Sequence, residues 1–532
     1  MSASTTSNQA RAVGFLQSGS GAIARTMQAK ARDIVSVADY DTGAANKALA
    51  IQAAMDAMNA ASGGIVHVPR GNYSLTTSPS MAGMVEVELR GEGPNATSLI
   101  VDAASVTGVS ITGLAQRCRV RDLWIGAFSA LASTSGIVIT GTSSALPASE
   151  IIVENVNVQN VATPINITDM HQSKFARVRV LQSIASAVTG VGLHLKAVIS
   201  SEFTNIDFLC TTGTFGSDNV RVDQDCDTVL FNHIEAIGGT TGYGIRCLNA
   251  AGTTGPRLTR FNNCYVEDTS EEAYWISAGR DIRFRGCHAA TSGMSGFIIT
   301  GGDSITFTDC LALQNDRHGF FVTGGTGVSF SLCAASNNSQ ETSNTYDGIR
   351  VEDGVSHVRL IGNRCGDFIF SLANVQRYGI SLGSTSDYVI CKDNDCQGNG
   401  TADFGNFSTG VNNDIDEDGT FTITLTGFAT PPTGTARFRR EGRQVTLYIP
   451  ALSGTSNATT CTLTGAPTNI RPARAQAVPT LITDNGTNAF GWGSMATGGT
   501  ITLYPSAALN ASGWTGSGTK AIVEQTISYS MQ

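Results

Sequence analysis

Two groups of polar side chains in this sequence could act on a carbohydrate, and the first consists of carboxylates. Charged residues make up only 14% of the 532 residues, so acidic residues that recur at matching positions are few. Cleavage of a glycosidic bond uses one carboxyl group as proton donor and a second as base or nucleophile. The candidate catalytic residues are Asp207, Glu235, Glu267 and Asp268.

The spacing of these carboxylates follows from a repeat of about 23 residues. In its register Glu235 and Glu267 are one coil and one strand step apart, which corresponds to about 8 Å. That separation suits an inverting glycosidase, whereas Asp207 and Glu235, about one coil apart, are nearer the spacing of a retaining pair. Asp268 or Asp207 is expected to raise the pKa of the acid by like-charge proximity. Alternatively, all four are solvated surface carboxylates.

The second group combines aromatic, basic and acidic residues that suit a sugar ring, which has an apolar face and a hydroxyl rim. Tyr265 and His288 fall on the same outward column as Glu235 and are expected to hold the sugar. The arginines could instead serve a lyase, as base or by neutralising a uronate. No acidic cluster specifies calcium, so we expect neither metal nor cofactor. The other candidate substrate-binding residues are Tyr243, Arg246, His318, Asp316, Asp347, Arg350, Glu352 and Tyr378.

The repeat is clearest where cysteines and phenylalanines recur at a constant interval of 23 residues. Each cysteine follows a phenylalanine by three positions, and a constant period of this size is typical of a solenoid. We expect the rings and the thiols to stack as ladders inside the protein, with the cysteines reduced. These residues are Phe261, Phe284, Phe307 and Phe330, with Cys264, Cys287, Cys310 and Cys333.

Each coil also shows the periodicity of short strands. Positions three and five after the phenylalanine are apolar or small, which is a strand period, so positions four and six should point outward. The step of three from the phenylalanine implies a bend with one extra residue, and a glycine opens a second strand, as in GIRC at 244 and GFFV at 319. The pattern predicts an all-β protein built on a right-handed, single-stranded parallel β-helix over residues 76–397. WD40 blades, with periods of ~40–45 residues, do not match.

The flanking segments are expected to differ from the solenoid. Residues 1–32 read as an arm or neck, and 33–75 as a capping helix, started by Asp41 or Thr42, with an entry strand. Residues 398–419 read as a linker, because turn formers and a short acidic run follow the last coil. Alternating strands such as FTITLTGF and RQVTLYIP predict an antiparallel β-sandwich over 420–532.

Charge and hydropathy exclude some partners. The formal net charge is −9, and a nucleic acid or an anionic membrane surface would require a basic face. No run of about 18 apolar residues is present, so we expect no membrane insertion. The N-terminus shows no secretory signal.

The segment from Val35 to Tyr73 resembles the entry of phage tailspikes and depolymerases in the pectate-lyase-like β-helix superfamily. The matching pieces are a VSV-x-D element at 35–39, AIQAA at 50–54, the Gly63-Gly64 stop and the strand VHVPRGNY at 66–73. The usual acidic stretch before the helix is reduced here to residues 41–43.

This resemblance implies a homotrimer whose N-terminus attaches to the phage tail or baseplate. It also implies recognition of a bacterial surface polysaccharide, such as a capsule, exopolysaccharide or O-antigen. The protein would be assembled in the host cytoplasm and act from the virion tail outside the cell, with the C-terminal module serving trimerisation or glycan binding. We expect endo-glycosidic hydrolysis; a polysaccharide lyase and a receptor-binding spike without turnover are the alternatives.

Overall fold

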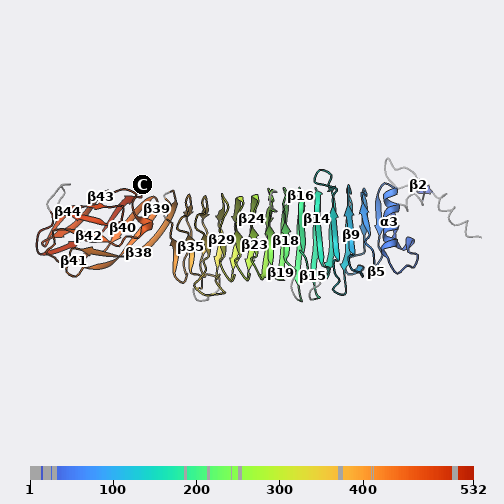
Figure 1. Ribbon diagram of the computed structural model, residues 1–532, viewed down its shortest axis with the longest axis horizontal. Helices are drawn as coiled ribbons and strands as arrows, with labels where there is room; N and C mark the ends of the chain where they lie inside the picture. The colour runs from blue at the N-terminus through green and yellow to red at the C-terminus, as the bar shows by residue number, and fades with distance from the viewer. Residues whose placement is uncertain are drawn as a thin grey trace, which may run out of the picture.

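The computed structural model shows a long rod with a helix at one end and a C-terminal module at the other (Figure 1). The structure describes residues 33–184, 189–212, 216–240, 242–249, 254–369, 375–408, 410, 412–505 and 513–531. It also describes two short paired strands, β1 (Gly14–Phe15) and β2 (Arg25–Thr26). The arm or neck predicted for residues 1–32 otherwise lies outside the described residues.

The rod is a right-handed parallel β-helix, as predicted, because corresponding strands of successive coils pair in parallel. One parallel sheet, the anchor sheet, holds the phenylalanine column. Its strands are β3 (Ile34–Ser36), β4 (Gly64–His67), β5 (Gly71–Leu75), β7 (Val87–Arg90), β8 (Thr97–Val101), β10 (Arg119–Gly126), β13 (Ile152–Gln159), β15 (Lys174–Gln182), β17 (Glu202–Cys210), β19 (Leu230–Thr240), β21 (Arg260–Asn262), β22 (Tyr265–Thr269), β24 (Arg280–Arg285), β25 (His288–Ala290), β27 (Asp303–Thr308), β28 (Leu311–Leu313), β30 (Ser329–Ser331), β31 (Ala334–Ser336), β33 (Arg359–Ile361), β34 (Arg364–Cys365) and β36 (Ile390–Lys392).

A second parallel sheet runs along the whole rod and is formed by the strands that follow in each coil. The glycine-opened segments of the sequence fall in these strands. They are β6 (Ser80–Ala82), β9 (Thr107–Thr112), β11 (Ser135–Thr140), β14 (Thr163–His171) with the short β12 (Ala148–Ser149) beside it, β16 (Leu193–Ile199), β18 (Asp218–Val222), β20 (Tyr243–Cys247), β23 (Tyr274–Ile276), β26 (Phe297–Ile299), β29 (Phe320–Val322), β32 (Ile349–Val351), β35 (Tyr378–Leu382) and β37 (Ala402–Asn406).

A bend divides each coil of the anchor sheet two residues after the anchor position. Asn205, His233 and Asn263 occupy it with φ of 53°, 57° and 51°. Short polar side chains such as that of Asn tolerate this left-handed conformation better than most. The extra residue predicted from the three-residue step is therefore confirmed, and it turns the following residues onto a new face.

Aromatic ladders fill the interior. The rings of Phe261, Phe284, Phe307 and Phe330 stack on successive coils with centroids 4.8 Å apart, which confirms the predicted column. A separate ladder from the second sheet meets it edge to face, formed by Tyr274, Phe297 and Phe320. All twelve cysteines have free thiols, and most of them are buried. After Cys333 the thiol column continues as Asn363 and Asn394, whose amides bond to each other.

A short helix closes the N-terminal end of the rod. Helix α3 (Ala48–Ala60) buries Ile51 and Met55 in the same core as the first coils. The helix starts later than predicted, because Asp41 accepts hydrogen bonds from the Gly43 amide and the Lys47 ammonium instead of capping it. The 3-10 helix η1 (Val37–Tyr40) precedes that turn.

The C-terminal module follows without a separate linker. Residues 398–419 were expected to be one, but β37 extends the second sheet there, and β38 pairs in parallel with β36 before pairing antiparallel with β39. The module has its own apolar core. Its elements are β38 (Asp414–Thr426), β39 (Thr433–Gly442), β40 (Gln444–Ile449), β41 (Leu452–Thr455), β42 (Cys461–Thr464), η2 (Thr468–Ile470), β43 (Gln476–Asp484), β44 (Thr487–Met495), β45 (Ile501–Tyr504), β46 (Thr519–Ile522) and β47 (Gln525–Ser530). No helix in the described part of the chain is long and apolar enough to cross a membrane.

Candidate functional site

The first group of predicted residues lies on one outward column of the anchor sheet. Asp207 is paired in register with Glu235, Glu235 with Tyr265, and Tyr265 with His288. These residues sit at position four of their coils, just after the bend, and between buried neighbours such as Ile234 and Ala236. The register predicted from the sequence holds through β17 and β19, although their coils are longer than 23 residues.

Asp207 and Glu235 form the pair of carboxylates that lie directly opposite each other. Burial raises the pKa of Asp207, and the neighbouring charge of Glu235 raises it further, while Arg179 and His233 act in the opposite direction. Glu235 has 41% of its side chain exposed, and its carboxylate is 3.4 Å from His233 Nε2. One carboxyl group thus has a raised pKa beside a second that solvent can reach, which is an arrangement used for acid catalysis.

Glu267 lies two residues after Tyr265 on strand β22 and is hydrogen-bonded to it. The Tyr265 hydroxyl donates a 2.8 Å hydrogen bond to Glu267 Oε2, and burial together with this bond raises the pKa of Tyr265 to about 12. The ring of Tyr265 meets His288 edge to face at 6.0 Å. Asp268 is turned by a φ of 58° and accepts a hydrogen bond from the Thr291 hydroxyl. It lies near the end of strand β22 and is hydrogen-bonded to the next coil.

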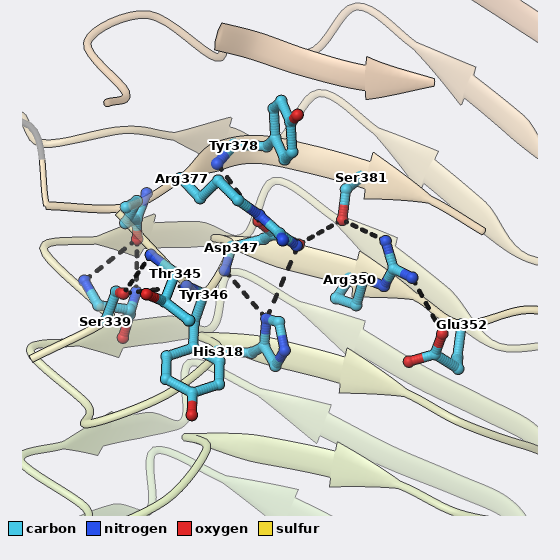
Figure 2. A network of polar contacts seen from close by, with 12 residues as sticks. His318, Ser339, Thr345, Tyr346, Asp347, Arg350, Glu352, Arg377, Tyr378 and Ser381 are labelled. Carbon is cyan, nitrogen blue, oxygen red and sulfur yellow. Dashed lines mark hydrogen bonds and ion pairs between the residues drawn. The ribbon is translucent and has the colours of Figure 1, made fainter. Parts of the chain in front are cut away.

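Five members of the second group lie along the second sheet in a network around Asp347, namely His318, Asp347, Arg350, Glu352 and Tyr378 (Figure 2). Asp347 is fully buried. Its carboxylate accepts two hydrogen bonds from the Arg377 guanidinium, at 2.9 and 2.8 Å, and one from the Ser381 hydroxyl. The backbone N–H of Tyr378 donates to it as well. Arg377, which the sequence analysis did not select, is the main partner of this carboxylate.

His318 and Arg350 complete this network. The Asp347 backbone N–H donates to His318 Nδ1 at 3.0 Å, so the ring accepts there. Burial lowers the pKa of His318 to about 4, and the nearby Asp347 carboxylate only partly offsets this. Arg350 donates to Glu352 at 2.9 Å, and this partner lowers the pKa of Glu352 despite its partial burial. Asp347 is thus paired with Arg377 and Glu352 with Arg350.

The remaining predicted residues of the second sheet lie closer to its middle. Arg246 stacks on Tyr243, with the guanidinium carbon 4.5 Å from the ring centroid, and also pairs with the buried Asp218. The sequence analysis missed Trp275, whose ring is 4.7 Å from that of Tyr243, because no glycine opens its strand. Asp316 lies in the turn before His318, and burial followed by the charge of Glu341 raises its pKa.

Glu272 was also missed, although it lies in the same column as Tyr243. The backbone N–H of Gly244 donates to its carbonyl, just as Gly319 donates to Asp347 in a later coil. Burial raises the pKa of its carboxyl group, and the adjacent Glu271 adds to this. The four carboxylates, Tyr265 and His288 thus lie on the anchor sheet, and the other predicted residues lie along the second sheet. Among the described residues, no group of three or more His, Cys, Asp or Glu could hold a metal ion.

Comparisons with known proteins agree with the architecture. A family model described as a right handed beta helix region matches residues 218–371. No curated protein sequence matches the chain. Among solved structures, the tailspike protein of E. coli bacteriophage HK620 in complex with pentasaccharide has a TM-score of 0.55 at 11% identity and covers 98% of each chain.

Two further structures are similar over most of the rod. Tailspike protein 3 of bacteriophage CBA120 has a TM-score of 0.50 at 14% identity, over 77% of this chain and 67% of that one. The A-module of the mannuronan C-5 epimerase AlgE4 from Azotobacter vinelandii has a TM-score of 0.49 at 17% identity, over 72% and 100% of the two chains. The resemblance of the fold to phage tailspikes, predicted from the entry segment, is confirmed.

Proposed function

We propose that this protein is a phage tailspike that binds a bacterial surface polysaccharide and depolymerises it by endo-glycosidic hydrolysis. Likeness to tailspikes, one of them in complex with a pentasaccharide, supports polysaccharide binding or processing. The observation that supports hydrolysis is the pairing of Asp207, with its raised pKa, against the exposed Glu235.

In this mechanism Asp207 is the acid and Glu235 the nucleophile. Directly opposite residues on neighbouring strands are about 4.8 Å apart at the backbone, which is close to the ~5–5.5 Å of retaining glycosidases. Asp207 donates its proton to the leaving glycosidic oxygen while Glu235 attacks the anomeric carbon. The Asp207 carboxylate then takes a proton from the water that hydrolyses the glycosyl–enzyme bond. We propose this pair in place of Glu235 with Glu267, the pair chosen from the sequence, because Glu267 already accepts a hydrogen bond from the Tyr265 hydroxyl.

The residues on either side of the pair suit a polysaccharide that lies along the column. Tyr265 and His288 offer ring surfaces and polar edges on the following coils, and sugars bind to such surfaces. We further propose a homotrimer that attaches to the phage tail through its N-terminus and acts outside the host cell. The second sheet, with Tyr243, Arg246 and Trp275, offers an additional sugar-contacting surface.

The test is product analysis after incubation with capsule and O-antigen polysaccharides from candidate hosts. Mass spectrometry should show saturated oligosaccharides with new reducing ends, and NMR should show a retained anomeric configuration. Asp207→Asn and Glu235→Gln should each lower turnover at least ~100-fold. Glu202→Gln is the matched control, because Glu202 is on the same strand as Asp207 and is 39% exposed, but lies before the bend.

Three outcomes would contradict the proposal. Unsaturated sugars that absorb in the ultraviolet would identify a lyase instead. Unchanged polymer length, despite binding, would identify a receptor-binding spike without turnover. Full activity of both Asp207→Asn and Glu235→Gln would place the catalytic site elsewhere, and Glu272 would then be the first residue to replace, because burial raises its pKa too.

A further inference from the structure

An uncharged aromatic pocket lies on the same outward column as Asp207, nearer the N-terminal end of the rod. Trp124 is paired in register with Asn157, Asn157 with Arg179, and Arg179 with Asp207. Three strand steps of ~4.8 Å separate Trp124 from Asp207, or about 14 Å. The pocket has a volume of about 390 Å³ and is lined by Pro94, Asn95, Ser98, Trp124, Phe128, Gln159, Asn160, Ser183 and Ile184.

Two rings form the floor of this pocket. Trp124 and Phe128 stack with centroids 5.5 Å apart and planes 23° from parallel. A Cβ atom built on Gly126 would lie 2.9 and 3.0 Å from Trp124 Cζ2 and Cη2, so the six-membered ring of the indole lies down over this glycine. A Cβ atom would also lie 2.2 Å from the backbone oxygen of Gln159, so glycine at position 126 allows both the close approach of the next coil and the position of the indole.

Phe128 is unusually accessible, with 68% of its surface exposed. An aromatic ring of this size is normally buried in a core or covered by a partner. Here it stacks on Trp124 and so extends the surface of that ring. Trp124 lies on strand β10, whose inward residues Leu123 and Ile125 are fully buried. The two rings therefore form a continuous apolar platform on which a ligand can bind.

Amides and hydroxyls form the rim, and their hydrogen bonds fix the platform. Trp124 Nε1 donates to Gln159 Oε1 at 2.9 Å, and Gln159 Nε2 donates to Ser183 Oγ at 2.7 Å. Asn160 Nδ2 also donates to Ser183 Oγ, at 3.1 Å. The side chain of Gln159 thus orients the indole. No charged residue is among the lining residues, although Arg179 and Asp207 follow on the same column.

We propose that this pocket is a binding subsite for an uncharged pyranose of the polysaccharide, remote from the catalytic pair. A sugar ring presents an apolar face that stacks on aromatic rings and hydroxyl groups that bond to amides. A charged sugar would find no counter-ion here. One part of this inference rests on the proposed function, namely that a single polymer reaches both this pocket and Asp207. Binding of a sugar to the platform does not depend on it.

The experiment uses the full-length protein and an array of purified bacterial O-antigen and capsular oligosaccharides, both neutral and uronate-containing. The native protein and Asp207→Asn should bind the same neutral oligosaccharides. Trp124→Ala and Phe128→Ala should each weaken that binding at least about tenfold. Phe490→Ala is the matched control, since Phe490 is 69% exposed in the C-terminal module and should leave binding unchanged. Melting temperatures of Phe128→Ala and Phe490→Ala should equal that of the native protein, because both phenylalanines are exposed.

Three results would overturn the proposal. The first is that the protein binds no neutral oligosaccharide, the second that it prefers uronate-containing ones, and the third that Phe490→Ala loses as much binding as Trp124→Ala. Dissociation of the oligomer by Trp124→Ala, measured by light scattering, would identify a second copy of the chain as the occupant. If Asp207→Asn still cut the polymer while Trp124→Ala failed to bind it, the catalytic pair would be wrong and the pocket would stand.

Discussion

The Asp207 column and the Asp347 network both lie on the same rod, yet their carboxylates have different partners. Asp347 is fully buried and receives hydrogen bonds from Arg377, Ser381 and a backbone amide. Asp207 instead faces another carboxylate, that of Glu235. Burial, and then the like charge of Glu235, raise the pKa of Asp207.

The two groups of contacts suit different roles, and the catalytic role that we propose for Asp207 follows from its contacts. The Asp347 network ties the long turn after β31 to strands β32 and β35 (Figure 2). It therefore holds the surface in shape. In the Asp207 column two carboxylates face each other instead, and such a pair is a candidate for a functional site.

The largest effect should come from breaking the Asp347 network. Asp347→Asn leaves the partly buried Arg377 guanidinium without its counter-charge, so the free energy of unfolding should fall by about 3–5 kcal/mol. Denaturant unfolding at pH 7 measures this. Glu202→Gln, which removes an exposed carboxylate, should change it by no more than about 0.5 kcal/mol. Equal stability of the two variants would show that the network contributes nothing to the fold.

The same network should make stability depend on pH through His318. Its pKa in the folded protein is about 4, against about 6.5 in an unfolded chain. As pH falls from about 6.5 to 4, the unfolded chain takes up a proton that the folded protein does not, so stability is lost over this window. The loss should reach up to about 3 kcal/mol.

His318→Gln isolates this contribution, because a glutamine oxygen can accept the Asp347 N–H but does not titrate. The difference in unfolding free energy between native protein and variant should therefore shrink or change sign between pH 7 and pH 4. A difference that is constant over that range would show that His318 titrates normally.

The repeat made most of the fold predictable. Columns such as Phe261 to Phe330 recur at constant spacing because stacked coils must place like residues on like residues, and the bend was visible as one extra residue. The start of α3 was not predictable, since Asp41 can serve equally as a helix cap or as the turn that binds Lys47. Only the packing of the first coil decides between them.

The sequence predicted which residues share the outward column, but it did not predict the role of each residue. The register placed Asp207, Glu235 and Tyr265 on one column, and the structure confirms it. Which carboxylate is held by a partner depends on side-chain contacts across coils, and a sequence does not show these. Trp124 was missed because its significance lies in the absent side chain of Gly126 and the exposure of Phe128.

A smaller effect should appear in the pH dependence of catalysis. If Asp207 is the acid, kcat/KM should fall as pH rises through its raised pKa, because the proton to be donated is lost. The charge of Arg179 lowers that pKa, so Arg179→Gln should move the alkaline limb to higher pH, by less than about one pH unit. The measurement is a kcat/KM profile for both proteins. A shift to lower pH, or none, would exclude Asp207 as the titrating acid.

The smallest effect should come from Tyr265 and Glu267, and it decides between the two carboxylate pairs. In the retaining mechanism Glu267 only contacts the sugar, so Tyr265→Phe, which removes one hydrogen bond, should raise KM by about threefold to tenfold and leave kcat nearly unchanged. Glu267→Gln should behave similarly. If Glu267 were instead the base of an inverting pair with Glu235, Glu267→Gln would lower kcat at least ~100-fold. The product would then show the inverted anomeric configuration, because water would attack directly from the face that Glu267 occupies.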